Sequence, residues 1–176
     1  MARLTILEYP DARLTTVAAR VTVFDAALGR LIEDLVETMY AAKGIGLAAT
    51  QVDVHLRLIA IDVAEAADCP QVFINPEILA SELPGLVEEG CLSLPGVYEN
   101  VKRATRIRVR FQDRDGTVLE RDLDGMAAVC VQHEMDHLQG KLFVDRLSFF
   151  KRRSAIKRLL ASRLQPKGER REAASG

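Results

Sequence analysis

The stretch QHEMDHLQG, residues 132–140, carries two of the three histidines in the chain. On a helix, His133 and His137 project from one face about one turn apart, so both imidazoles can reach the same cation. Glu134 is rotated by about 100° from His133. That is too far round for an obvious ligand, yet close enough to touch a water on the metal, as a general base beside a Lewis acid must. The spacing therefore predicts a hydrolytic metal site.

The competing interpretation is an ordinary helix face with two partly exposed histidines. Met126, Val129 and Cys130 lie on the same face and would form with the histidines one buried stripe. Burying two imidazoles without partners is costly. The flanking residues therefore favour the metal site.

A metal site with a reactive water needs a third protein ligand. Downstream, LQGKLFVDRLSFF offers only Asp145, whereas EEGCLSLPG upstream holds Cys91. A free cysteine is usually a small buried hydrophobe, but a site short of one ligand favours Cys91. Cys130 is one turn before His133 and is expected to line the pocket, because a third ligand from the same helix would crowd the metal.

The stretch GIGLAATQ, residues 44–51, is the third whose residues could take part in catalysis or binding. Gly44 and Gly46 permit a positive φ or a close approach of the backbone to a ligand. The amide of Gln51 can both donate and accept hydrogen bonds. Alone the stretch is ambiguous, because the glycines could cap a helix and turn a corner, and a lone glutamine is more often a solvated surface residue.

Three helices are predicted to position these stretches. The first runs from about Asp25 to Lys43, with Asp25 as its cap and Gly44 as its end. The second begins at Asp124, carries the histidines and is closed by a glycine at position 140. The third covers roughly residues 147–164.

Strand-like runs lie between the first two helices. LRLIAIDV and QVFIN are nearly continuous apolar runs, and RIRVRF alternates with Ile107, Val109 and Phe111 on one face. The turn signal DRDG at 113–116 predicts that RIRVRF pairs antiparallel with TVLERDL. Strand clusters between helices, without βαβ alternation, predict an α+β fold.

Composition bounds the class of protein. The 176 residues are 48% hydrophobic and 28% charged, with a net charge of −1. We expect one catalytic domain over residues 1–165 and a disordered tail over residues 166–176. With no apolar run of 18 residues, no signal peptide, and only three cysteines, a cytoplasmic protein without a membrane partner is expected.

In this order, GIGLAATQ, EGCLSLP and QHEMDHLQG resemble the three signature motifs of peptide deformylases, and the resemblance runs from about Leu4 through LFVDRLS. It implies an α+β fold with antiparallel β-sheets packed around a central metal-binding HExxH helix, and a C-terminal helix. It also implies removal of the N-terminal formyl group from formyl-methionyl nascent polypeptides, with release of formate, in a bacterial cytoplasm.

The resemblance implies a role for each metal-site residue. Cys91, His133 and His137 would bind one divalent metal, Fe(II) in bacteria, with Zn, Ni or Co able to occupy the site. Metal-bound water would attack the formyl carbon, and Glu134 would act first as general base and then as general acid.

It also implies how the substrate is held. Gln51 and the backbone N–H of Leu92 would stabilise the oxyanion, and Gly46 would contact the peptide backbone of the substrate. The walls of an apolar pocket for the methionine side chain would be Ile45, Met126, Val129 and Cys130, whose alternative role is plain core.

The chain departs from the family pattern at two places. Lys43 stands where many members carry an acidic residue, so an ion pair from that position to a basic residue such as Arg103 would be lost. Gly96-Val97-Tyr98 replaces the more polar run of some members, which leaves the substrate contacts there open.

The segment Phe149–Arg163 holds six Lys or Arg and no acid. Ile156, Leu159 and Leu160 could pack this helix on the core and leave a basic outer face. That face is either simply solvated or contacts ribosomal RNA near the nascent chain, because attraction to phosphates needs little sequence specificity.

Two other functions compete with the deformylase. One is a zinc metallopeptidase that cleaves internal peptide bonds with a downstream third ligand. The other is an RNA-binding protein with a vestigial HExxH, against which the intact Gln51, Cys91 and Glu134 argue.

Overall fold

The computed structural model describes residues 2–64, 66 and 68–164. The predicted tail at 166–176, and residue 165 before it, lie outside the described residues. The elements are η1 (Ala12–Thr15), α1 (Ala26–Ala41), β1 (Gly46–Ala48), η2 (Ala49–Val52), β2 (Leu58–Ile61), β3 (Gln71–Cys91), β4 (Leu94–Gln112), β5 (Val118–Asp124), α2 (Gly125–Leu138), η3 (Phe143–Arg146) and α3 (Phe149–Leu164).

The strands form one sheet in the order β1-β2-β3-β4-β5, and every neighbouring pair is antiparallel. This confirms the predicted α+β class. It also corrects the predicted strand lengths, because QVFIN and EEGC belong to the same 21-residue strand β3, and RIRVRF is the end of the 19-residue strand β4. The predicted turn at 113–116 joins β4 to β5, with Phe111 opposite Leu119.

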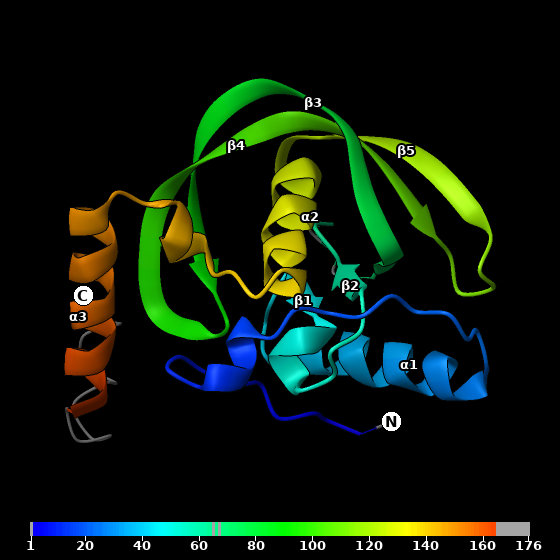
Figure 1. Cartoon of the computed structure of the whole chain (residues 1–176), viewed down its shortest axis with the longest axis horizontal. Coiled ribbons are helices and arrows are strands. Elements are labelled where there is room, and N and C mark those ends of the chain that lie inside the picture. Colours follow the sequence, from blue (N-terminus) through cyan, green and yellow to red (C-terminus); the bar gives the residue numbers. More distant parts are fainter. Residues whose placement is uncertain (1, 65, 67, 165–176) are drawn as a thin grey trace.

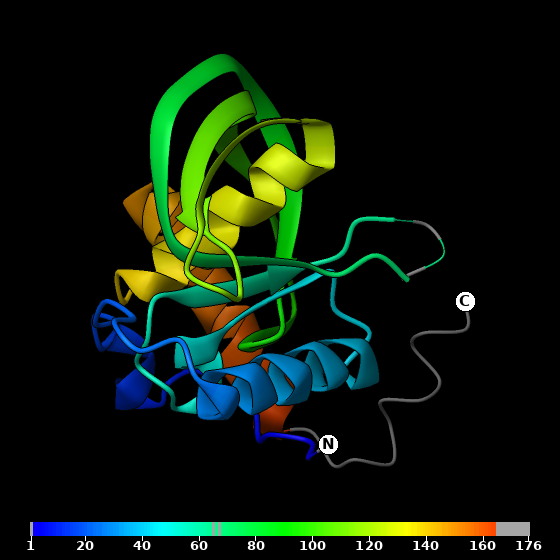
Figure 2. The same cartoon turned by 90° about the vertical axis from the view of Figure 1, so that its right-hand side faces the viewer.

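The β3–β4 hairpin is strongly curved. The pairing register shifts between Ile74 and Glu77 and again between Ile78 and Ala80, and Asn75 and Leu83 have positive φ. Extra residues in one strand bend it and increase its twist. The hairpin therefore arches over α2, which lies within the arch in both views (Figures 1 and 2).

Helix α2 is buried on nearly all sides, as expected for a central helix. On one side it packs against Ile107, Val109 and Phe111 of β4, the alternating residues that the sequence predicted to share one face. Ile59 and Ile61 of β2 belong to the same cluster. This burial fixes the position of the HExxH motif between the arch and the short strands.

Helix α1 covers the other face of the short strands, with Ile32, Leu35 and Met39 fully buried. Its predicted cap is confirmed, since the side chain of Asp25 accepts hydrogen bonds from two backbone N–H groups of the first turn. Its predicted end is wrong: the helix stops at Ala41, and the residue with a positive φ is Lys43.

Helix α3 packs against the start of β4 through Ala155 and Leu159, which are buried with Val97 and Val101. Ile156 is partly buried, but Leu160, which the sequence placed in the same contact, is 42% exposed. It lies about 100° round the helix from Leu159, outside the buried stripe. Among the described residues, no helix is both long and apolar enough to cross a membrane.

Candidate metal centre

The three predicted ligands meet in space. Cys91 is the last residue of β3, while His133 and His137 lie on α2, and the three ligand atoms lie within 4.8 Å of one another. The Sγ of Cys91 is 3.2 Å from Nε2 of His137. The pairing of Cys91 with Leu94 leaves Leu92 and Ser93 as the two-residue turn of the hairpin. The turn thus places the cysteine directly against the helix.

This donor set fits a divalent metal. Bonds of about 2.0–2.3 Å to a tetrahedral ion put neighbouring ligand atoms about 3.3–3.6 Å apart, close to the spacing between Cys91 and His137. Burial alone would raise the pKa of the Cys91 thiol, but the imidazoles of His137 and His133 hold that pKa well below its ordinary value. The thiolate, which is the form that binds metals, is therefore favoured.

Asp145, the alternative third ligand, is engaged elsewhere. Its carboxylate accepts a hydrogen bond from the backbone N–H of Leu142 and pairs with Arg152 at 2.9 Å. It is not part of the ligand cluster found among the described residues. The structure therefore favours an upstream cysteine over a downstream carboxylate.

Gln51 is 1% exposed, which excludes the solvated surface residue considered above. Its Oε1 accepts from the backbone N–H of Ala48 at 2.8 Å. Its Nε2 donates to Oγ of Ser93 at 3.1 Å and points at Sγ of Cys91 at 3.6 Å. Both ends of the amide are thus fixed, and its donor faces the metal ligands.

Glu134 is buried beside the ligands without being one of them. Its Oε2 has no hydrogen-bond partner among the described residues, and burial raises the pKa of its carboxyl. Gly46 of β1 leaves the space that this side chain occupies, because a Cβ there would overlap Oε1 of Glu134 and lie 2.7 Å from Sγ of Cys130. A buried carboxylate oxygen without a partner is suited to a ligand or a water.

A cavity of about 450 Å³ opens onto Glu134, His133 and Cys91. The cavity is lined by all the residues that the resemblance assigned to substrate binding, which are Ile45, Gly46, Met126, Val129 and Cys130. Gln51, Leu92 and Tyr98 line it as well. Met126 does not continue the buried stripe of α2, since it is 48% exposed. It lies where that stripe meets solvent.

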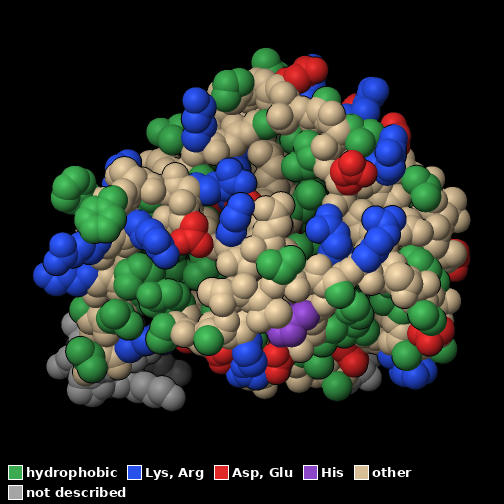
Figure 3. All heavy atoms as spheres, viewed as in Figure 1, with side chains coloured by type: hydrophobic (Ala, Val, Ile, Leu, Met, Phe, Trp, Pro, Cys, Tyr) green, Lys and Arg blue, Asp and Glu red, His purple; other side chains and the backbone are tan. Residues whose placement is uncertain are grey.

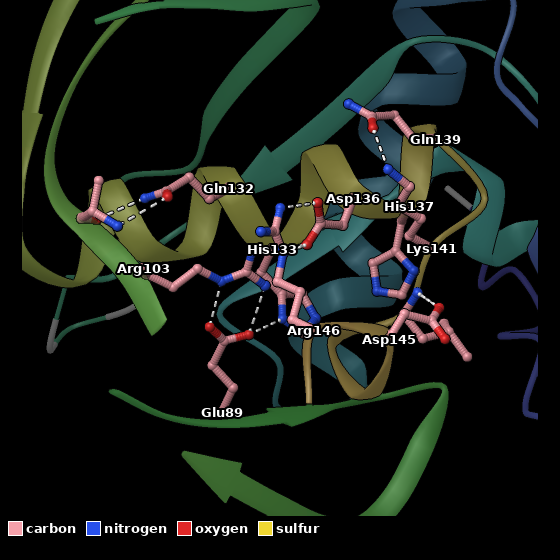
Figure 4. A network of polar contacts seen from close by, with 12 residues as sticks. Glu89, Arg103, Gln132, His133, Asp136, His137, Gln139, Lys141, Asp145 and Arg146 are labelled. Atoms are coloured by element: carbon pink, nitrogen blue, oxygen red, sulfur yellow. Dashed lines mark hydrogen bonds and ion pairs between the residues drawn. The ribbon is translucent and has the colours of Figure 1, made fainter. Parts of the chain in front are cut away.

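A buried polar network supports His133 (Figure 4). Its Nδ1 lies 2.7 Å from Oε2 of Glu89. Arg103 binds the same carboxylate with two N–H groups, at 2.6 and 2.9 Å, and donates a third to Asp136 at 2.7 Å. Glu89, Arg103 and Asp136 are all at least nine-tenths buried. An imidazole fixed in this way presents its other nitrogen to the metal.

This network corrects the expectation about Lys43. The sequence suggested that an acid missing at that position would leave Arg103 unsupported. In the structure, Arg103 is paired with Glu89 and Asp136, while Lys43 lines the cavity.

The sequence reasoning missed Glu89, although a signal for it existed. Side chains two apart on a strand share a face, and Glu89 lies two residues before Cys91 on β3; in the structure Glu89 contacts His133 and Cys91 contacts His137. Burial alone would raise the pKa of the Glu89 carboxyl, but hydrogen bonds from Arg103 and His133 lower it.

Comparisons with known proteins agree with this geometry. A family model described as polypeptide deformylase matches residues 3–153. The peptide deformylase of Chromobacterium violaceum is 58% identical over 151 residues, which are 86% of this chain and 90% of that protein. The crystal structure of a peptide deformylase from Legionella pneumophila matches with a TM-score of 0.87 at 44% identity, over 94% of this chain and 100% of that one. A peptide deformylase from Synechococcus elongatus, solved in complex with actinonin, matches with a TM-score of 0.84 at 40% identity, over 88% of this chain and 86% of that one.

Proposed function

The chain belongs to the polypeptide deformylase family, and we propose that it removes the N-terminal formyl group from formyl-methionyl nascent polypeptides in a bacterial cytoplasm. Its metal site and its activity as a peptide deformylase follow from the ligand cluster and the family. The proposal concerns the residues that carry each step. It rests above all on Glu134, whose buried, unpartnered carboxylate oxygen adjoins the ligands and the cavity.

When bound, a divalent metal lowers the pKa of a coordinated water to about 7 and polarises a carbonyl oxygen. Glu134 takes a proton from the attacking water while the water oxygen forms a bond to the formyl carbon. Glu134 then hands that proton to the leaving amine as the carbon–nitrogen bond breaks, so formate and a free N-terminus are released. Burial supports this role, because a raised pKa lets the carboxyl hold a proton between the two steps.

Two donors would stabilise the negative oxygen that forms between these steps. One is Nε2 of Gln51, whose other end is held by Ala48 and which already points toward the metal ligands. The other is the backbone N–H of Leu92, in the turn directly after Cys91. Removing one such donor typically costs about 10²–10³-fold in kcat.

The cavity supports a methionine at the N-terminus of the substrate. Its lining is largely apolar and includes Ile45, Met126, Val129 and Cys130 as well as Glu134. The absence of a side chain at Gly46 would let the substrate backbone approach β1 closely.

We propose Fe(II) as the metal in the cell, with Zn, Ni or Co able to replace it. A thiolate with two imidazoles suits each of these ions.

Fewer cations of α3 are available for a contact with the ribosome than its sequence suggested. Three of its cations are engaged by acids of the same chain, since Arg152 pairs with Asp145, Arg158 with Glu99 and Arg163 with Glu8. The remaining three, Lys151, Arg153 and Lys157, are exposed. Figure 3 shows Lys and Arg side chains beside exposed apolar ones on the side where α3 lies. We propose that these three side chains contact ribosomal RNA.

The assigned role of Glu134 is tested by Glu134→Gln. The variant should keep its metal, because Glu134 is not a ligand, and should lose on the order of 10²–10⁴-fold in kcat for formate release from formyl-Met-Ala-Ser. Metal content and kcat are measured on the same preparation. A variant with metal and near-normal kcat would show that another group moves the proton.

A further inference from the structure

Arg146 lies outside the cavity, yet it is connected to a metal ligand through an unbroken series of ion pairs and hydrogen bonds. It binds Asp136 with two N–H groups, at 2.5 and 2.6 Å. Asp136 accepts from Arg103, Arg103 binds Glu89, and Glu89 binds His133. Figure 4 shows these side chains in one continuous network. We propose that Arg146 is a positioning residue for His133 that acts through Asp136. The inference rests on the metal site of the proposed function, but not on its substrate.

The link in the middle is a shared guanidinium. Arg103 is 2% exposed and is divided between two carboxylates, with two N–H groups on Glu89 and one on Asp136. Glu89 in turn holds Nδ1 of His133. If Arg103 shifted toward Asp136, its hydrogen bonds to Glu89 would weaken. Glu89 would then fix the orientation of the His133 imidazole less firmly.

Arg146 neutralises Asp136, so that Arg103 is not drawn away from Glu89. Among Glu89, Asp136 and Arg103 there are two negative charges and one positive charge, all buried. A buried carboxylate without full compensation is costly. Arg146, with its side chain 46% exposed, supplies the second positive charge and occupies both oxygens of Asp136. With Arg146 in place, Asp136 needs only one N–H from Arg103.

The element that carries Arg146 also packs on His133 directly. Arg146 is the last residue of η3, and Phe143 at the start of η3 is buried and stacks on the imidazole of His133 with ring centroids 6.0 Å apart. Asp136 lies three residues after His133, almost one turn further along α2. The pair between Arg146 and Asp136 therefore fixes η3 to the same turn of α2 that carries the ligand.

A neighbouring arginine provides a matched control. Arg152 also forms an ion pair with an aspartate, and its side chain is 53% exposed. Its partner Asp145 is 29% exposed and is not among the hydrogen-bond or ion-pair partners of Arg103 and Glu89. Removing Arg152 takes away the same charge from the same region of the surface without touching the network.

The experiment measures metal release, with no formyl substrate present. Protein loaded with Co(II) under argon is mixed with excess chelator, and loss of the thiolate-to-cobalt absorption gives the rate. Arg146→Met should release Co(II) about tenfold faster than the parent, the lower end of what loss of a supporting contact costs. Arg152→Met should stay within about twofold of the parent. Equal release rates for the two variants would overturn the proposal.

The route is tested in a double-mutant cycle. If Arg146 acts through Asp136, Arg146→Met should add less than about twofold in an Asp136→Asn background. An equally large effect in both backgrounds would show another route and overturn the proposal. Unfolding of each metal-free variant is followed by circular dichroism. If Arg146→Met does not fold, Arg146→Lys, which keeps the charge but not the two-pronged contact, takes its place; a release rate equal to the parent would then overturn the proposal.

Discussion

Adding one methyl group at Gly46 should impair catalysis without impairing metal binding. A Cβ on Gly46 would lie 2.7 Å from Sγ of Cys130 and closer still to Oε1 of Glu134, whereas ordinary contact begins at 3.4 Å. Because β1 is paired with β2 on one side, the strand cannot simply retreat, and the carboxylate must move by roughly 1 Å. A misplacement of about 1 Å can cost about 10²-fold in rate.

We therefore expect Gly46→Ala to lower kcat for formate release from formyl-Met-Ala-Ser by about 100-fold, or about 2.7 kcal/mol of transition-state stabilisation. Overpacking of this kind should also lower the free energy of unfolding by about 1–3 kcal/mol. Metal content should stay at one ion per chain, because no atom of Cys91, His133 or His137 is among the nearest neighbours of the added Cβ. Steady-state kinetics and metal analysis on one preparation check both statements.

Gly29→Ala is the matched control. Gly29 lies within α1, and a Cβ there meets nothing within 4 Å. This variant should keep full activity and gain about 0.5–1 kcal/mol of stability from the better helix propensity of alanine. A Gly46→Ala enzyme with the kcat of the parent would refute the reasoning, and so would one whose lost activity is explained by lost metal.

Three further predictions concern the metal and α3. Cys91→Asp should lower the affinity for Zn(II) and Co(II) in chelator competition, because a hard oxygen replaces a soft thiolate; unchanged affinity would place the third ligand elsewhere. Iron-loaded enzyme should lose activity in air, faster with peroxide, and regain part of it with Ni(II) or Co(II); air-stable activity of a preparation holding only zinc would contradict an iron enzyme. Replacing Lys151, Arg153 and Lys157 with Gln should weaken ribosome binding and flatten its salt dependence while leaving activity on small formyl peptides intact; binding equal to the parent at every salt concentration would leave the helix face merely solvated.

The features that sequence reasoning predicted correctly are local. The cap at Asp25, the turn before β5 and the alternation of RIRVRF each depend on residues a few positions apart, and the structure confirms them. The HExxH spacing is local as well, because the helical period alone brings His133 and His137 to one face. Such patterns survive folding, because the tertiary structure only has to bury the face that they already define.

The features that were missed depend on contacts between distant segments. The helix was predicted to end at Gly44 because glycine is the usual residue with positive φ, but Lys43 takes that conformation. Gly44 serves a different need, since a Cβ there would lie 2.8 Å from Cδ1 of Leu92 in the cysteine turn. Likewise, no local pattern showed that Arg103 is shared by Glu89 and Asp136, because these residues meet only after the hairpin has closed over α2.

The two periodicities of the fold explain why ligand and support come together. On β3, a period of two puts Glu89 and Cys91 on the face toward α2. On α2, positions 133, 136 and 137 share the facing side. One alignment of strand and helix therefore sets both the bond from Cys91 to the metal and the bond from Glu89 to His133. A slip of β3 by one residue would turn both side chains away together. The pairing of the hairpin also shifts its register between Gly90 and Cys91, so that Cys91 pairs with Leu94 and the tight turn that follows holds it against α2.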